Sequence, residues 1–217
     1  MRAAPRLRGG AAARTASLFV GLAVIGAAIV ALLESGLGLA PWDVFHLGLA
    51  AHSPLTIGTA SIVVGLAVLL VAWALGQRPG FGTLANAVVI GAVVDLLRRV
   101  PWVARLSSSG LPVRGGLLLL GVGLFGLGSA LYIGAGLGAG PRDSLMLALA
   151  RRTGVRIAVV RAALEISALA VGWALGGVVG VGTVGAALLL GPAVEASFRL
   201  LVRLGVAEPA PSLELAP

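Results

Sequence analysis

The chain has 217 residues, of which 59% are hydrophobic and only 11% are charged, and its mean hydropathy is +1.06. Soluble domains carry about 25% charged residues, so this composition excludes a water-soluble globular protein and indicates an all-α polytopic membrane protein. The net charge of +8 comes from sixteen Arg without Lys, and these Arg lie in loops between apolar segments. That distribution favours the lipid bilayer over nucleic acid as the partner of the positive charge. Because Cys is absent, disulfides, thiol chemistry and Cys-based metal sites are excluded.

An Arg-rich segment, residues 1–15, opens the chain and is followed by an apolar run over 16–34. This arrangement is similar to a signal peptide, but the run exceeds the ~7–15 apolar residues of a signal core. We therefore expect a retained first helix with a cytoplasmic N-terminus. Because Arg is used to the exclusion of Lys beside so much Ala and Gly, a GC-rich bacterial genome is indicated. The expected location is the bacterial inner membrane.

Six apolar runs are long enough to cross a bilayer, which takes about 20 residues per helix. They fall into a first transmembrane unit at 16–100 and a second at 116–203, separated by a basic loop at 101–115. A proline-containing tail at 204–217 is predicted to be disordered. The predicted spans are 16–34, 57–76, 82–99, 116–135, 157–176 and 182–200.

The two units resemble each other at an offset of 100 residues. Without a gap, residues 36–95 match residues 136–195 at 21 of 60 positions. Composition explains matched Gly, Ala, Leu and Val, but it does not explain Pro41, Asp43, Trp73 and Thr83 recurring in one register. We interpret the chain as two tandem repeats of about 100 residues, each with three long helices and one short Gly/Pro-broken helix. Such duplication in a hydrophobic chain is typical of transporters.

The short helix of each repeat follows the pattern Gly-x-Gly-x-x-Pro-x-Asp. Gly disfavours helix by roughly 1 kcal/mol relative to Ala, whereas Pro is well placed at the first helical position. We therefore expect an extended stretch followed by a helix that starts at Pro41 or Pro141. If this segment crosses the membrane, the repeats are parallel with four passes each; if it re-enters, they are inverted with three. Crossing leaves fourteen Arg on the cytoplasmic side and re-entry leaves twelve, so the Arg count favours crossing.

The strings Gly38-Leu39-Ala40-Pro41-Trp42-Asp43 and Leu75-Gly76-Gln77-Arg78-Pro79-Gly80-Phe81-Gly82-Thr83 resemble the YczE-type bacterial membrane proteins, which are relatives of the YitT group. The resemblance covers residues 16–200. It implies a small multi-span inner-membrane protein and supplies no substrate or reaction.

The candidate site residues gather at the short helices. Asp43 and Asp143 are ionisable groups at membrane depth, which cost at least ~2.5–3.5 kcal/mol and indicate function. They could face a shared cavity and bind a cation, a proton or an amine, or each could cap its helix. Arg142 stands where the first repeat has Trp42. It could pair with either Asp, bind an anionic headgroup or extend to the interface.

Two further candidates are His46 and Glu165. His46 follows Asp43 by three residues, but Asp-x-x-His without a third ligand is weak evidence for metal, and no metal or cofactor is predicted. Glu165 lies inside an apolar span four residues after Arg161, which permits an ion pair. A proton relay is the alternative.

The sequence carries no conventional enzyme signature, since its Gly-rich stretches lack a phosphate-loop Lys. We therefore expect a non-enzymatic protein, a small transporter or permease whose site lies between the repeats and whose substrate is an unknown small molecule or ion. The alternative is a non-transporting membrane scaffold or regulatory partner. The oligomeric state is not predicted.

Overall fold

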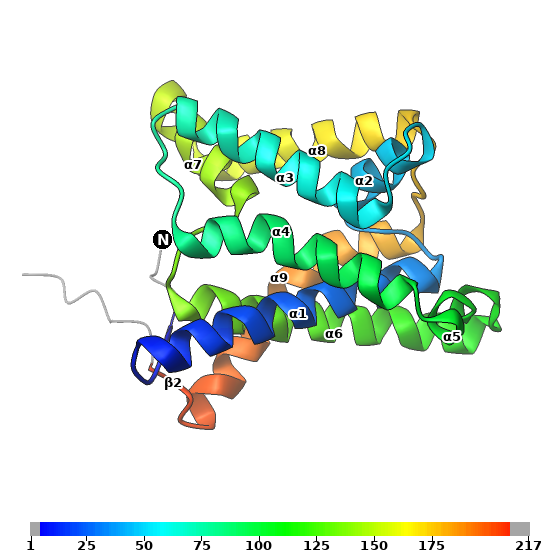
Figure 1. Ribbon diagram of the computed structural model, residues 1–217, viewed down its shortest axis with the longest axis horizontal. Coiled ribbons are helices and arrows are strands. Elements are labelled where there is room, and N and C mark those ends of the chain that lie inside the picture. Colours follow the sequence, from blue (N-terminus) through cyan, green and yellow to red (C-terminus); the bar gives the residue numbers. More distant parts are fainter. Residues whose placement is uncertain (1–4, 209–217) are drawn as a thin grey trace, which may run out of the picture.

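A computed structural model describes residues 5–208, and it confirms the all-α polytopic architecture (Figure 1). Within these residues, six helices are long and apolar enough to cross a membrane. They are α1 (Ala11–Ser35), α3 (Ile57–Ala74), α4 (Phe81–Arg98), α6 (Leu111–Ala135), α8 (Ile157–Ala174) and α9 (Val181–Arg203). The shorter elements are α2 (Pro41–Ala51), α5 (Pro101–Ala104), the 3-10 turn η1 (Leu106–Ser108), α7 (Pro141–Thr153), and strands β1 (Arg6–Leu7) and β2 (Ala207–Glu208).

The predicted spans coincide with the six long helices, but α1 and α6 each begin five residues earlier than expected. The reason is that Arg14 and Arg114 lie inside the helices. The Arg14 guanidinium donates to the carbonyls of Ala135 and Gly136 at the end of α6, and Arg114 donates to those of Ser35 and Gly36 at the end of α1. A cation at a helix C-terminus is stabilising. Arg14 therefore stabilises the C-terminus of α6, and Arg114 stabilises that of α1.

The two broken segments have the expected local structure. Gly36 and Gly136 end α1 and α6 in the left-handed conformation, with φ of 58° and 64°. Four residues of loop then lead to Pro41 and Pro141, each at the start of a short helix. Proline is tolerated at this position because the N–H that it lacks would have no intrahelical partner.

Helices α1 and α6 form the centre of the fold and run antiparallel. Gly21, early in α1, lies against the backbone of Gly128 and Tyr132, late in α6. Toward the end of α1, Leu32 lies against Gly121, early in α6. The two halves of the chain therefore enter the bundle in opposite directions.

The prediction that the short segments cross the membrane is wrong. Arg114 at the start of α6 contacts the end of α1, and Thr56 before α3 donates to Asp95 near the end of α4. Glu34, at the end of α1, also pairs with Arg98, at the end of α4. Because the end of α1 and the start of α3 both contact the end of α4, they lie on the same side of the bundle. Helix α2 enters and leaves on that side, and α7 does so on the opposite side. Arg counting failed because crossing and re-entry differ only in where six Arg fall, and the moves in the two directions nearly cancel in the count.

Contacts recur 100 residues apart. The N–H of Gly82 donates to Leu137 O at 2.8 Å, and the N–H of Gly182 donates to Leu37 O at 2.7 Å. The extended stretch of each half is thus attached to the last helix of the other half.

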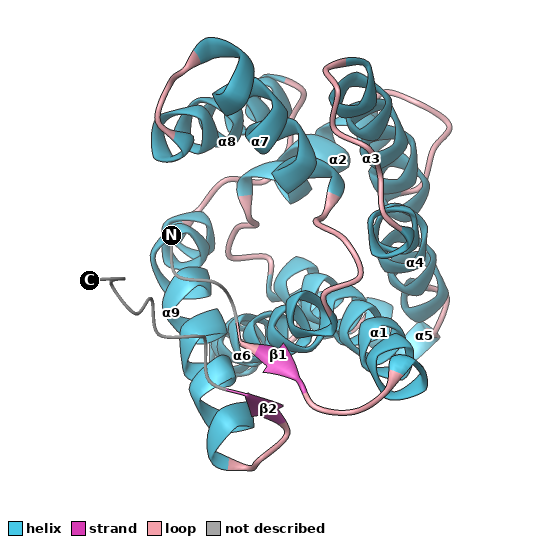
Figure 2. Cartoon of the chain, turned by 90° about the vertical axis from the view of Figure 1, so that its left-hand side faces the viewer, coloured by secondary structure: helices cyan, strands magenta, loops and turns pink. Residues whose placement is uncertain are grey.

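The helices form two layers (Figure 2). Helices α1, α4, α6 and α9 pack into one layer, and α2, α3, α7 and α8 pack into the other. Each layer combines helices from both halves of the chain. Along one edge, α3 packs against α4 and joins the layers.

The predicted loop at 101–115 and tail at 204–217 are partly ordered. Residues 101–115 include α5, η1 and the first turn of α6. In the tail, Ala207 and Glu208 pair antiparallel with Leu7 and Arg6. Residues 209–217 lie outside the described residues, as do residues 1–4 of the Arg-rich segment.

The re-entrant arrangement predicts the outcome of cysteine labelling. Since the chain has no native Cys, Ser53→Cys and Thr153→Cys each provide a single thiol, after α2 and at the end of α7. We expect an impermeant maleimide to label the two thiols from opposite sides of intact vesicles. Labelling of both from the same side would contradict re-entry.

Close packing of α1 on α6 predicts a matched pair of stability effects. A Cβ at Gly128 would lie 2.7 Å from Gly21 O, whereas a Cβ at Gly123 on the same helix meets nothing within 4 Å. Gly128→Val should therefore lower the free energy of unfolding by about 1–3 kcal/mol, the usual cost of overpacking. Gly123→Val should have little effect. Titration of detergent-solubilised protein with SDS measures both, and equal losses would refute this packing.

Candidate functional site

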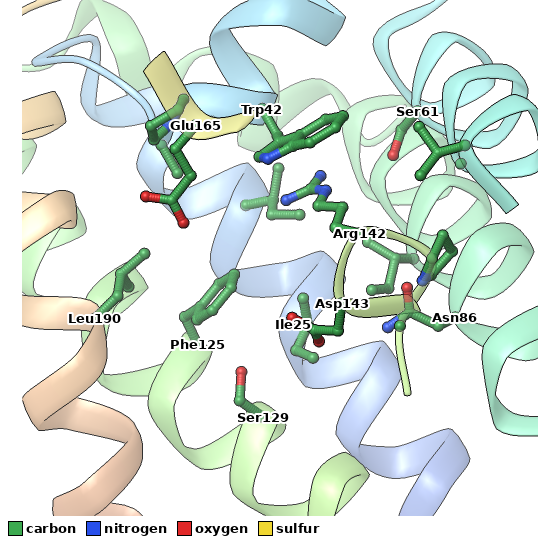
Figure 3. Close-up of a pocket in the computed structure, with 18 of the residues that line it drawn as sticks. Ile25, Trp42, Ser61, Asn86, Phe125, Ser129, Arg142, Asp143, Glu165 and Leu190 are labelled. Carbon is green, nitrogen blue, oxygen red and sulfur yellow. The ribbon is translucent and has the colours of Figure 1, made fainter. Parts of the chain in front are cut away.

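A cavity of about 580 Å³ lies between the two layers (Figure 3). This volume lies within the ~300–1,000 Å³ of small-molecule sites. Its walls are mostly apolar, and its lining includes four charged side chains, Arg142, Asp143, Arg161 and Glu165.

Both short helices begin at this cavity. Ala40 and Gly140, which precede their first turns, belong to its lining, as do Pro41 and Pro141. A helix N-terminus carries about half a positive charge, and each first turn here holds an acidic residue, Asp43 or Asp143. Neither helix start has a side-chain cap hydrogen bond. The N-cap residues are Ala40 and Gly140, and each Asp stands three positions further into its helix, where its charge faces the positive helix end.

Arg142 pairs with the Asp of the other half of the chain, not with Asp143 beside it. Its Nη2 lies 3.8 Å from Asp43 Oδ1, and its guanidinium lies 4.9 Å from the ring centre of Trp42. Asp43 is buried, with 3% of its side chain exposed, and His46 Nδ1 lies 3.5 Å from the same carboxylate oxygen. Arg142 therefore links α7 to α2 through a charge pair and a cation–π contact.

Asp143 has no basic side chain within 4 Å among the described residues. Polar groups lie near it: a Cβ built on Gly140 would lie 3.5 Å from Asp143 Oδ2, 3.3 Å from the Tyr132 hydroxyl and 3.7 Å from the Asn86 amide nitrogen. Figure 3 shows Asp143 and Asn86 on the same side of the cavity. Asp143 is thus a carboxylate with room for an external partner.

Glu165 forms the expected ion pair on α8, with Arg161 Nε 3.0 Å from its Oε1. The pair is partly exposed, at 64% for the Arg161 side chain and 36% for Glu165. Both residues belong to the cavity lining. With the Asp43 pair included, two guanidinium groups at the site stand against three carboxylates, so the formal charges of the side chains, taken without the two helix ends, leave one negative charge in excess.

The structure brings most of the sequence candidates together. Trp42, His46, Arg142, Asp143 and Glu165 line the cavity, and Asp43 lies behind Arg142. Sequence reasoning missed Ser61, Ser129 and Tyr132, which also line it. Ser129 and Tyr132 are three residues apart in an apolar helix, and this one-faced polar spacing was a usable signal.

The groups around the cavity can bind a charged solute. Within the described residues, no group of three His, Cys, Asp or Glu is placed to hold a metal ion. The cavity presents the Asp143 carboxylate, the Arg142 guanidinium paired with Asp43, hydroxyl and amide groups, and apolar walls. Such a set can hold a solute that carries a positive charge.

Comparisons with known proteins agree with the resemblance drawn from the sequence. The model of a Family of unknown function (DUF6198) matches residues 12–199. An uncharacterized protein of Haemophilus influenzae is 39% identical over 189 residues, which cover 86% of this chain and 84% of that protein. The uncharacterized membrane protein YczE of Bacillus subtilis is 36% identical over 190 residues, 86% of each chain. No solved structure matches.

Proposed function

The chain belongs to the DUF6198 family, whose function is unknown, and on that premise we propose a small non-enzymatic transporter that binds a positively charged solute in the central cavity. The observation that carries the proposal is the position of Asp143. It lies at the start of a re-entrant helix, in the cavity wall, without a basic partner among the described residues. A carboxylate at membrane depth costs free energy even when it is half-buried, and binding a cation would offset that cost.

The fold supports transport by movement of one layer against the other. Irregular backbone at membrane depth is tolerated where it lines a cavity, and both broken segments do so here. Transporters bind substrate near such discontinuous helices. Because each layer contains helices from both halves, the moving units are the layers and not the two sequence repeats.

Arg placement supports a cytoplasmic N-terminus in a bacterial inner membrane. With both short helices re-entrant, Arg98, Arg99, Arg105 and Arg114 lie on one side, and the other described Arg, apart from Arg142 and Arg161 in the cavity lining, belong to the side of the N-terminus. The side with more Arg is cytoplasmic in most membrane proteins.

A binding screen tests the proposed function. Purified protein is heated with a panel of amines and quaternary ammonium ions, tetramethylammonium first, and flux of any stabilising ion is then followed in protein-containing vesicles. A ligand at 100 times its Kd stabilises the folded state by about 2.7 kcal/mol, so binding should raise the unfolding temperature. Neutral solutes of matched size serve as the control.

The scaffold alternative predicts a different result from the same material. No cation would stabilise the protein or cross the vesicle membrane, and a second protein would co-purify with it. A cavity that contains charged residues favours the transporter, because a scaffold has no need for unpaired charge at membrane depth.

A further inference from the structure

The two edges of the layers differ. Along one edge, α3 and α4 pack closely: a Cβ at Gly58 would lie 2.2 Å from Gly91 O, and Gly65 lies against Ala87. The N–H of Gly58 also donates to Asp95 at 3.0 Å. This edge is closed.

The opposite edge, between α8 and α9, is open. Within residues 5–208 these helices make almost no contact with each other, although both line the cavity. Gly91 is buried, but Gly191, its counterpart 100 residues later, is exposed, and a Cβ added there would meet nothing within 4 Å. Figure 3 shows Glu165 from α8 and Leu190 from α9 on the same side of the cavity.

Three sequence differences between the halves explain the open edge. Ala158 stands where Gly58 allows close approach, Glu165 stands where Gly65 packs on Ala87, and Pro192 interrupts α9 beside Gly191. A Cβ at the first position and a charged side chain at the second prevent the close contact that joins α3 to α4. Proline also removes one helical hydrogen bond and bends its helix.

The surface around the opening is apolar. Ile166 on α8 and Leu188 on α9 are 65% and 68% exposed, and these residues flank the lining positions. Exposed leucine and isoleucine on membrane-crossing helices face lipid chains, so the opening leads into the bilayer. At its rim, the Arg161–Glu165 pair is the polar feature.

We propose that the α8–α9 opening admits an amphiphile from the bilayer, a molecule with a cationic group in its head and an apolar chain. This inference rests on the proposed function and names its substrate class. The head binds at Asp143, a carboxylate without a basic side chain within 4 Å among the described residues, and the chain lies along Leu190 and the other apolar residues of α9 toward the lipid. Charge at the deep end and apolar surface at the opening match the two ends of such a molecule.

Tryptophan quenching in vesicles tests the opening. Trp42 lines the cavity, whereas Trp73, Trp102 and Trp173 are exposed and are replaced by Phe to leave Trp42 alone. The probe is phosphatidylcholine with brominated chains, whose head carries a quaternary ammonium. We expect it to quench Trp42, and we expect Ala187→Phe/Gly191→Phe, which fills the opening, to cause a loss of that quenching. Leu188→Phe on the outer face of α9 is the matched control and should leave quenching unchanged.

Each other outcome overturns the inference. Quenching that survives the filled opening comes from surrounding lipid, not from lipid in the cavity. Quenching of Trp42 by aqueous acrylamide but not by bromolipid means that the cavity opens to water. No bromolipid quenching in a protein that migrates as a dimer means that a second copy covers this edge. A protein retaining Trp173 alone reports folding and membrane insertion, because that residue is 69% exposed.

The two proposals fail separately. If bromolipid enters but no cation crosses the membrane, the transport proposal is refuted and the lipid-facing opening is retained. If a soluble cation such as tetramethylammonium crosses the membrane but bromolipid does not enter, the transport proposal is retained and the amphiphile proposal is refuted.

Discussion

Arg142→Gln should lower the free energy of unfolding by about 3 kcal/mol. This value lies at the lower end of the 3–5 kcal/mol for breaking a buried charge pair, because 39% of the Arg142 side chain is exposed to the cavity. The loss arises because Asp43, with 3% of its side chain exposed, is left without its positive partner. SDS titration of the solubilised protein measures the effect.

A double variant separates the charge pair from simple loss of packing. Asp43→Asn/Arg142→Gln removes both charges and should be more stable than Arg142→Gln alone, since no unpaired charge remains. Arg142→Lys should be intermediate, because it keeps the charge but lacks the planar group that lies over Trp42. If the double variant is no more stable than Arg142→Gln, the Asp43–Arg142 pair does not hold the layer together.

Asp143→Asn should weaken binding of tetramethylammonium by roughly ten- to hundredfold. Interactions with a charged group contribute about 1.5–3 kcal/mol, and every 1.4 kcal/mol is tenfold in Kd. Stability should stay the same or rise slightly, since Asp143 has no ion-pair partner within 4 Å among the described residues and Asn removes an unpaired charge. Isothermal titration gives the Kd, and vesicle flux should fall in parallel.

Glu195→Gln is the matched control for this variant. It also neutralises a carboxylate on a membrane helix, but Glu195 is 65% exposed, pairs with Arg199 and is absent from the cavity lining. Its Kd should equal that of the unmodified protein. Unchanged binding in Asp143→Asn would remove the observation on which the proposed function depends.

Of the two charge pairs at the cavity, the sequence predicts one and cannot predict the other. The Arg161–Glu165 pair follows from helical spacing alone, since residues four apart share a face. The Arg142–Asp43 pair joins residues 99 positions apart, which requires α7 to meet α2. Arg142 has Asp143 as its chain neighbour, yet consecutive helical residues point in different directions and do not pair.

The sequence by itself determined the number and place of the long helices, and the start of each short helix at Pro41 or Pro141. These are local properties, set by apolar run length and by the backbone preferences of Gly and Pro. It also selected five of the cavity residues, because ionisable and aromatic groups beside a broken helix stand out in an apolar chain.

Tertiary structure alone decided the direction of each segment, the partner of Arg142 and the open edge between α8 and α9. Re-entry and crossing use the same residues, and they differ only in which helix the segment packs against. That choice is fixed by contacts such as Gly182 N–H to Leu37 O, between residues 145 positions apart. Packing between distant glycines, present at Gly58 and Gly91 but absent at Gly191, then closes one edge and leaves the other open.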